Sequence, residues 1–246
     1  MAVVKPFICI RPAKENAAKV AALPYDVYNR KEACAAVAGN PISFLNIDRA
    51  ETQFSDDVDT YADCVYEKAR ELLDTQIAEG VYVTDAGDHY YLYELTMDGR
   101  SQTGIVACSS IDDYMNGVVK KHELTREDKE QDRIHHVDSC NANTGPIFLA
   151  CRYPDSLLTL MNNWKDHHEA AYDFTEEDQI THRVWVIDED EVISEINKEF
   201  AGIDSLYIAD GHHRAASAVK VGLKRREQNP GYTGEEEFNY FLSVVF

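Results

Sequence analysis

The sequence predicts an α/β fold, with α+β as the alternative, in which helices flank a mixed sheet. Asp98-Gly99 stands between two apolar runs, residues 89–95 and 104–111, and this arrangement is typical of a β-hairpin. An apolar run at 206–209 leads directly into a helical pattern at 212–223, which indicates a strand–helix unit. With 246 residues, 44% of them hydrophobic, the chain can bury a core without disulfide support.

In the first half of the chain, prolines and glycines separate the expected elements. Arg11-Pro12 ends the first apolar run, Pro24 ends an alanine-rich segment, and Gly39-Asn40-Pro41 forms a turn. The longest expected helix has apolar residues at helical spacing through most of its length. The predicted elements are a strand at 3–10, a helix at 13–23, a short strand at 43–47 and a helix at 56–79.

The second half of the chain continues as an alternation of charged helical segments and short apolar strands. We predict helices at 125–137, 156–164, 189–200 and 212–223, and strands at 147–151, 184–187, 206–209 and 238–246. Residues 1–246 are expected to form one continuous unit, with a weaker alternative boundary near residue 140. Because natural termini are usually polar, the apolar run at the end of the chain suggests that the protein continues beyond Phe246.

Composition excludes several classes of partner. The chain carries 44 acidic against 24 basic residues, a formal net charge of −20, which argues against a nucleic-acid groove. No segment has the length and apolarity of a membrane span, so no membrane partner is expected. The six cysteines form no Cys-x-x-Cys pair, and we expect them to be reduced thiols of a cytoplasmic protein.

The densest polar segment follows the apolar run at 206–209. Here Asp210 and Gly211 lead into a helix that begins with His212, His213 and Arg214. The start of a helix offers unpaired N–H groups and the positive end of the dipole, which suit a phosphate, and Arg214 can contact phosphate oxygens. Asp210 is then a candidate metal ligand or base. The structural alternative is that Asp210 only caps the helix and that the histidines are surface residues.

A second polar segment has the same placement, after an expected strand and before an expected helix. Lys120 and Lys121 are candidate phosphate ligands, and His122 and Glu123 are candidate catalytic residues. Thr125 is expected to cap the helix that follows. If the two segments meet in the fold, they form one site.

The sequence favours Mg²⁺ over a resident transition metal. Nine histidines include three adjacent pairs, and neighbours on a helix point in different directions, so such pairs rarely chelate one ion. A second histidine four residues after His122, as zinc proteases require, is missing. One or two carboxylates together with substrate phosphates suffice for Mg²⁺, and Asp210 or Glu123 could supply them. No common nucleotide-binding glycine loop is present.

Several short motifs together resemble one family, the domain-of-unknown-function family number 1015. The resemblance covers essentially the whole chain in order. It is carried by Pro6-Phe7, Leu23-Pro24-Tyr25-Asp26-Val27, Gly39-Asn40-Pro41, Tyr91-Leu92-Tyr93-Glu94, His122-Glu123-Leu124-Thr125, Asp132-Arg133 and Tyr207-Ile208-Ala209-Asp210-Gly211-His212-His213-Arg214.

The last of these motifs is also similar, over a few dozen residues, to the phosphate-binding junction of ParB/sulfiredoxin-fold nucleotide enzymes, which include free-serine kinases. In those kinases a similar stretch contacts nucleotide phosphates, and an acidic residue activates the serine hydroxyl. This resemblance implies a ParB/sulfiredoxin-like element in the fold. It does not say whether Glu123 or Asp210 would correspond to the acidic residue.

The leading hypothesis is therefore an enzyme, a phosphotransferase that uses Mg²⁺ and a nucleoside di- or triphosphate and acts on a small hydroxylated metabolite. Gly211, His212, His213, Arg214, Lys120 and Lys121 would bind the phosphates, and Glu123, Asp210 and His122 would act in catalysis. The alternatives are a non-enzymatic regulator that binds a nucleotide or metabolite, and a metal-dependent hydrolase.

Overall fold

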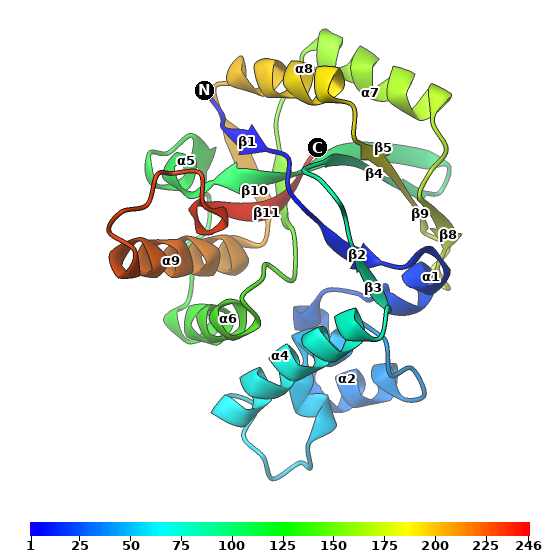
Figure 1. The fold of residues 1–246 in the computed structure, drawn as a ribbon. Coiled ribbons are helices and arrows are strands. Elements are labelled where there is room, and N and C mark those ends of the chain that lie inside the picture. Colours follow the sequence, from blue (N-terminus) through cyan, green and yellow to red (C-terminus); the bar gives the residue numbers. More distant parts are fainter.

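The computed structural model describes residues 1–246 and has a large mixed β-sheet at its centre (Figure 1). This sheet of nine strands, with helices packed around it, confirms the predicted α/β class. Its order is β6-β10-β7-β11-β5-β4-β9-β8, and β1 pairs with β5. The strands are β1 (Val4–Lys5), β4 (Tyr90–Met97), β5 (Arg100–Ser110), β6 (Val119–Lys120), β7 (Ile147–Ala150), β8 (Tyr172–Thr175), β9 (Thr181–Ile187), β10 (Leu206–Asp210) and β11 (Tyr240–Val245).

The strand pairings explain why the sheet is mixed. β4 and β5 form the antiparallel hairpin predicted at Asp98-Gly99, where both residues have positive φ, 52° and 76°, as a tight two-residue turn requires. β11 runs parallel to β7 and antiparallel to β5, and β10 runs parallel to β6 and antiparallel to β7. The last strand of the chain therefore lies inside the sheet rather than at its edge.

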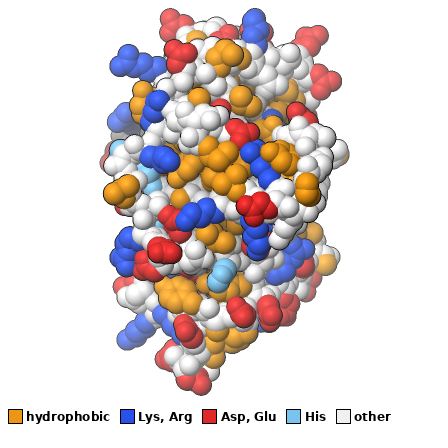
Figure 2. Space-filling view, turned by 90° about the vertical axis from the view of Figure 1, so that its left-hand side faces the viewer, with side chains coloured by type: hydrophobic (Ala, Val, Ile, Leu, Met, Phe, Trp, Pro, Cys, Tyr) orange, Lys and Arg blue, Asp and Glu red, His pale blue; other side chains and the backbone are white.

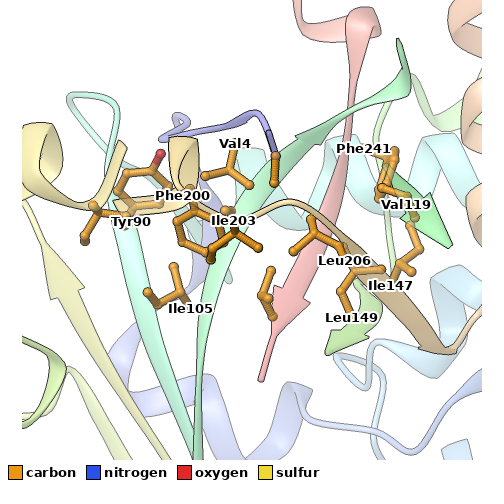
Figure 3. Packing of buried hydrophobic residues seen from close by; sticks show 14 of the residues in the cluster. Val4, Tyr90, Ile105, Val119, Ile147, Leu149, Phe200, Ile203, Leu206 and Phe241 are labelled. Atoms are coloured by element: carbon orange, nitrogen blue, oxygen red, sulfur yellow. The ribbon is translucent and has the colours of Figure 1, made fainter. Parts of the chain in front are cut away.

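Five helices pack around this sheet: α5 (Ile111–Met115), α6 (Glu127–Cys140), α7 (Asp155–His167), α8 (Asp190–Ala201) and α9 (His212–Gln228). In Figure 1, α7 and α8 lie together at the top, whereas α5, α9 and α6 lie on the left. The main core has 25 buried residues. Figure 3 shows that Tyr90 and Ile105 of the hairpin meet Phe200 and Ile203.

The N-terminal segment forms a smaller helical layer below the sheet in Figure 1. It contains the helices α1 (Ala17–Val20), α2 (Arg30–Val37), α3 (Leu45–Asp48) and α4 (Asp63–Ala78), the 3₁₀ turns η1 (Lys14–Asn16), η2 (Tyr25–Val27) and η3 (Ala50–Gln53), and the two-stranded sheet of β2 (Ile10–Pro12) and β3 (Tyr82–Thr84). A further 3₁₀ turn, η4 (Glu237–Asn239), precedes β11. Nine buried residues form a second core here, and one of them, Cys140, comes from α6.

Several boundaries differ from the sequence prediction. The predicted strand at 43–47 is wrong, because residues 45–48 form α3. The Asn46 side-chain amide donates to the carbonyls of Asn40, Pro41 and Ser43, and this ties the chain into a turn that periodicity alone does not reveal. The strand predicted at 3–10 divides into β1 and β2, and the helix predicted at 56–79 begins only at Asp63. The helix predicted at 13–23 shrinks to η1 and α1.

The alternative boundary near residue 140 stays a prediction, as does the single continuous unit. The chain does change direction there. α6 ends at Cys140, and Asn141 takes a left-handed conformation with φ 50°.

Gly222 tests the packing that positions α9. A Cβ at Gly222 would lie 2.4 Å from the Phe238 carbonyl oxygen and 2.8 Å from Ile111 Cδ1. We expect Gly222→Ala to lower the free energy of unfolding by about 1–3 kcal/mol, since this overpacking outweighs the gain in helix propensity. Urea unfolding of both proteins measures this change in the free energy of unfolding. Gly231→Ala is the matched control, because a Cβ there meets nothing within 4 Å, and an equal midpoint change in both variants would contradict the account.

Candidate functional site

The predicted phosphate-binding segment lies where β10 ends and α9 begins, and we call residues 210–214 the junction. Gly211 has φ 91°, a left-handed conformation that glycine adopts without strain. As the N-terminal boundary residue of α9, Gly211 has no side chain to cap the helix, and no other side chain does so. The first N–H groups of this 17-residue helix therefore remain available for an anion.

Arg214 links the junction to the segment that precedes β7. Its Nη2 lies 2.6 Å from Asp210 Oδ2, and its Nη1 donates to the Pro146 carbonyl at 2.5 Å. A Cβ at Gly211 would lie 3.1 Å from the guanidinium, so the tight turn and the arginine fit each other. Each terminal nitrogen of Arg214, predicted to bind phosphate, thus donates one hydrogen bond to the protein and keeps a second N–H group. Asp210 keeps one carboxylate oxygen outside this ion pair.

The loop of residues 121–126 crosses the junction, so the structure brings the two predicted polar segments together. Glu123 Oε2 lies 3.6 Å from His212 Nδ1, and the rings of His122 and His212 meet edge to face at 4.4 Å. The Arg126 backbone N–H donates to His213 Nε2 at 3.1 Å. His212 and His213 therefore face different neighbours, as adjacent residues at the start of a helix should.

The two predicted lysines have contacts other than the junction, although β6 pairs with β10. Lys120 belongs to the edge strand β6, and Lys121 places its Nζ 4.0 Å over the ring of Tyr114 in α5. Neither lysine forms a hydrogen bond or an ion pair with residues 210–214. The predicted cap at Thr125 is wrong, because Arg126 is the boundary residue of α6 and the Thr125 hydroxyl donates to the Glu130 carboxylate instead.

His212 is a buried, uncharged imidazole. It is only 4% exposed, and its Nε2 has no hydrogen-bond partner. Burial, followed by the neighbouring His122, lowers the pKa of His212 below its usual value, although Glu123 opposes this. The aligned N–H groups of α9 therefore lie beside a neutral ring.

A polar cavity of about 260 Å³ adjoins the junction on the side of His213. It is bounded by the segment around η2, by α3 and η3, by α4 and by α6. Four tyrosines and seven formally charged side chains line it: Tyr25, Tyr28, Tyr61, Tyr66, Asp26, Asp48, Arg49, Glu51, Lys129, Asp132 and Arg133.

Arg133 is the most buried of the arginines and lysines that line this cavity. It is 7% exposed, and its guanidinium lies 4.0 Å from the ring centroid of Tyr25. Asp132 Oδ2 pairs with it at 3.0 Å, while Asp132 Oδ1 accepts the Tyr66 hydroxyl at 2.9 Å. α6 thus carries the arginine, and both the N-terminal segment and α4 hold it in place.

None of these cavity residues was predicted from the sequence as a site residue. A signal was present, since Lys129, Asp132, Arg133 and His136 recur at helical spacing on α6 where a core-facing stripe would normally be apolar. The other walls come from distant segments, for example Tyr25 and Asp48. No local pattern links those residues to α6.

Two findings concern the structure as a whole. No group of three or more His, Cys, Asp or Glu side chains is arranged to hold a metal ion. No helix has the length and apolar character needed to cross a membrane. Figure 2 views the left-hand side of Figure 1, where acidic and basic side chains alternate around a central group of hydrophobic ones, and neither sign forms a continuous patch.

Comparison with known proteins identifies a family. The family model described as "Protein of unknown function (DUF1015)" matches residues 4–246, which confirms the resemblance drawn from the motifs. No curated protein and no solved structure matches the chain. The similarity of the junction to ParB/sulfiredoxin-fold enzymes therefore stays an expectation.

We predict that two buried histidines make stability depend on pH. Burial, and next the charge of Arg133, lowers the pKa of His136, as burial does for His212. At pH values above about 6.5, the pKa of a histidine in the unfolded chain, the contribution of both histidines to the free energy of unfolding is fully present. Below it the unfolded chain takes up protons that the folded protein does not, so stability falls by up to about 1.4 kcal/mol per pH unit and histidine.

The measurement is urea unfolding at pH 7.5 and pH 5.5. His136→Asn should lose less stability between these two values than the unchanged protein, because one of the two histidines is gone. Carboxylates that titrate at lower pH contribute equally to both proteins and cancel in the comparison. An identical loss in both proteins would contradict the assignment of a neutral, buried His136.

Proposed function

For a chain that belongs to the DUF1015 family over residues 4–246, we propose the function of a Mg²⁺-dependent phosphotransferase that moves a phosphoryl group from a nucleotide to a small hydroxylated metabolite. The observation that carries this proposal is the uncapped start of α9, placed between a carboxylate, Glu123, on one side and a polar cavity on the other. A phosphate at the start of α9 would then have a base on one side and a space for an acceptor on the other.

The phosphates would bind at the start of α9. The N–H groups of residues 212–214 and the positive end of the helix dipole favour an anion there. His213 adds an imidazole at the edge of the cavity. Arg214 would act mainly by keeping Gly211 and Asp210 in place, since both of its terminal nitrogens bond to the protein.

The transfer itself needs little covalent participation by the protein. The acceptor hydroxyl oxygen forms a bond to the terminal phosphorus, and the bond from that phosphorus to the bridging oxygen of the nucleotide breaks. The hydroxyl proton passes to the Glu123 carboxylate, and the shortened nucleotide leaves with the electron pair. The protein contributes position and charge stabilisation.

Asp210 fits a nucleotide-borne Mg²⁺ better than a resident metal. Mg²⁺ usually keeps several waters and binds one or two carboxylates together with substrate phosphates, so it needs no three-ligand protein cluster. The Asp210 side chain is 65% exposed and has one oxygen outside the Arg214 pair. The ion would neutralise phosphate charge. A hydrolase with a tightly bound transition metal has less support, because such a metal usually takes three protein ligands and no group of three is arranged for one.

The second candidate is a regulator that binds the same nucleotide without turning it over. The uncapped helix start favours binding and says nothing about catalysis, so this alternative uses the same contacts. In either case we propose a small-molecule ligand and a cytoplasmic location. Six cysteines without any disulfide support that location.

We predict that a nucleotide with Mg²⁺ stabilises the protein against heat. At about 100 times its Kd a ligand adds about 2.7 kcal/mol, roughly 5–10 °C for a chain of this size. The measurement is thermal unfolding with ATP, ADP, CTP and GTP. His213→Ala should reduce the rise, whereas His167→Ala, an exposed histidine at the end of α7, should keep it. The absence of a rise with all four nucleotides would remove the proposal.

We also predict that Glu123→Gln separates enzyme from regulator. Loss of the general base should slow phosphoryl transfer about 10²- to 10⁴-fold and leave the nucleotide-induced thermal rise unchanged. The measurement is nucleotide consumption with a panel of hydroxylated acceptors. Nucleotide binding without consumption by the unchanged protein would favour the regulator.

A further inference from the structure

The inner wall of the cavity holds more negative than positive charge. Two of its carboxylates have cationic partners, since Glu51 Oε1 lies 2.6 Å from Arg49 Nε, and Asp132 pairs with Arg133. The third, Asp48, has no lysine or arginine nitrogen within 4 Å, although its side chain is only 13% exposed. Two exposed lining residues, Asp26 and Lys129, add one charge of each sign. Asp48 is therefore the one buried carboxylate of this wall without a lysine or arginine in contact.

Arg133 attracts Asp48 as well as Asp132, but the groups in direct contact with Asp48 carry no positive charge. The Thr144 hydroxyl donates to Asp48 Oδ1 at 2.8 Å. His136 Nε2 lies 3.8 Å away, but its proton is directed at the Ile47 carbonyl oxygen, 3.1 Å distant, and burial keeps the ring neutral. A largely buried, unpaired charge is costly, and a bound cation removes that cost.

Arg133 adds the complementary feature. Its Nε and Nη2 face Asp132, whereas its Nη1 donates to no protein group, although the residue is 7% exposed and lines the cavity. A ligand oxygen would complete its hydrogen bonding. The cavity therefore offers an acceptor for a cation and, nearby, a donor for an oxygen.

We infer that the cavity binds a small hydroxylated amine, with Asp48 as the counter-ion of its ammonium group and Arg133 as the donor to one of its oxygens. An organic cation fits better than a metal ion, because no third ligand accompanies Asp48 and Asp132, and because tyrosine rings line the wall. Only the further step, that this amine accepts the phosphoryl group, rests on the proposed function.

The first test is calorimetric titration of the unchanged protein, without nucleotide, with ethanolamine, glycerol, glycolate, serine and MgCl₂. Ethanolamine should bind, and glycerol and glycolate should not, because they lack the ammonium group. Tighter binding of serine than of ethanolamine would support the inference and would place a carboxylate on Arg133. Equal binding of ethanolamine and glycerol, or displacement of ethanolamine by Mg²⁺, would overturn it.

The second test removes the counter-ion. Asp48→Asn should weaken ethanolamine binding by about ten- to a hundredfold, and the matched control Asp166→Asn, an exposed residue of α7, should leave it unchanged. If Asp48→Asn does not fold, the titrations of the unchanged protein still decide the question. Amine binding without any thermal effect of nucleotides would retain this inference and reject the proposed function. A thermal effect of nucleotides without amine binding would reject this inference and retain the proposed function.

Discussion

The site depends on the hydrogen bonds that the buried carboxylate of Glu130 accepts. It is 5% exposed, and it accepts hydrogen bonds from Lys220 on α9 and from Thr125 at the end of the loop 121–126. Its backbone carbonyl also accepts the Ser217 hydroxyl at 3.1 Å. Although burial raises the pKa of Glu130, these hydrogen bonds keep it below its usual value. Because α6 carries Glu130 and also lines the cavity, this one residue connects the cavity wall with the loop and with α9.

As a result, the two histidines at the start of α9 have different surroundings. His212 faces Glu123 and His122, whereas His213 lies at the cavity. The loop 121–126 is the least buried part of the site, and Leu124 within it is 94% exposed. Loops with so few buried contacts open and close at low cost in free energy. A ligand that spans both sides of the helix would order this loop.

The parts predicted correctly from the sequence are those set by local chemistry. The hairpin at Asp98-Gly99 follows from turn geometry, and the junction follows from a strand, a glycine and a helix in direct succession. The sequence left open whether Glu123 reaches the junction, because only the similar placement of the two segments after strands connects them, and the structure brings Glu123 next to His212. The cavity could not be predicted in this way, because residues such as Tyr25, Asp48 and Arg133 become neighbours only through tertiary packing. α3 was missed because a side-chain amide, not periodicity, determines its geometry.

The central claim, that the uncapped start of α9 is an anion site, is tested most directly by nuclear magnetic resonance of the backbone amides. Titration with pyrophosphate and Mg²⁺ should shift the amide signals of His212, His213 and Arg214 more than those of other residues, with Gly211 next. The amides at the start of α8 serve as an internal reference, since that helix also begins without a side-chain cap. Equal shifts at α8 and α9, or none at α9, would contradict the account.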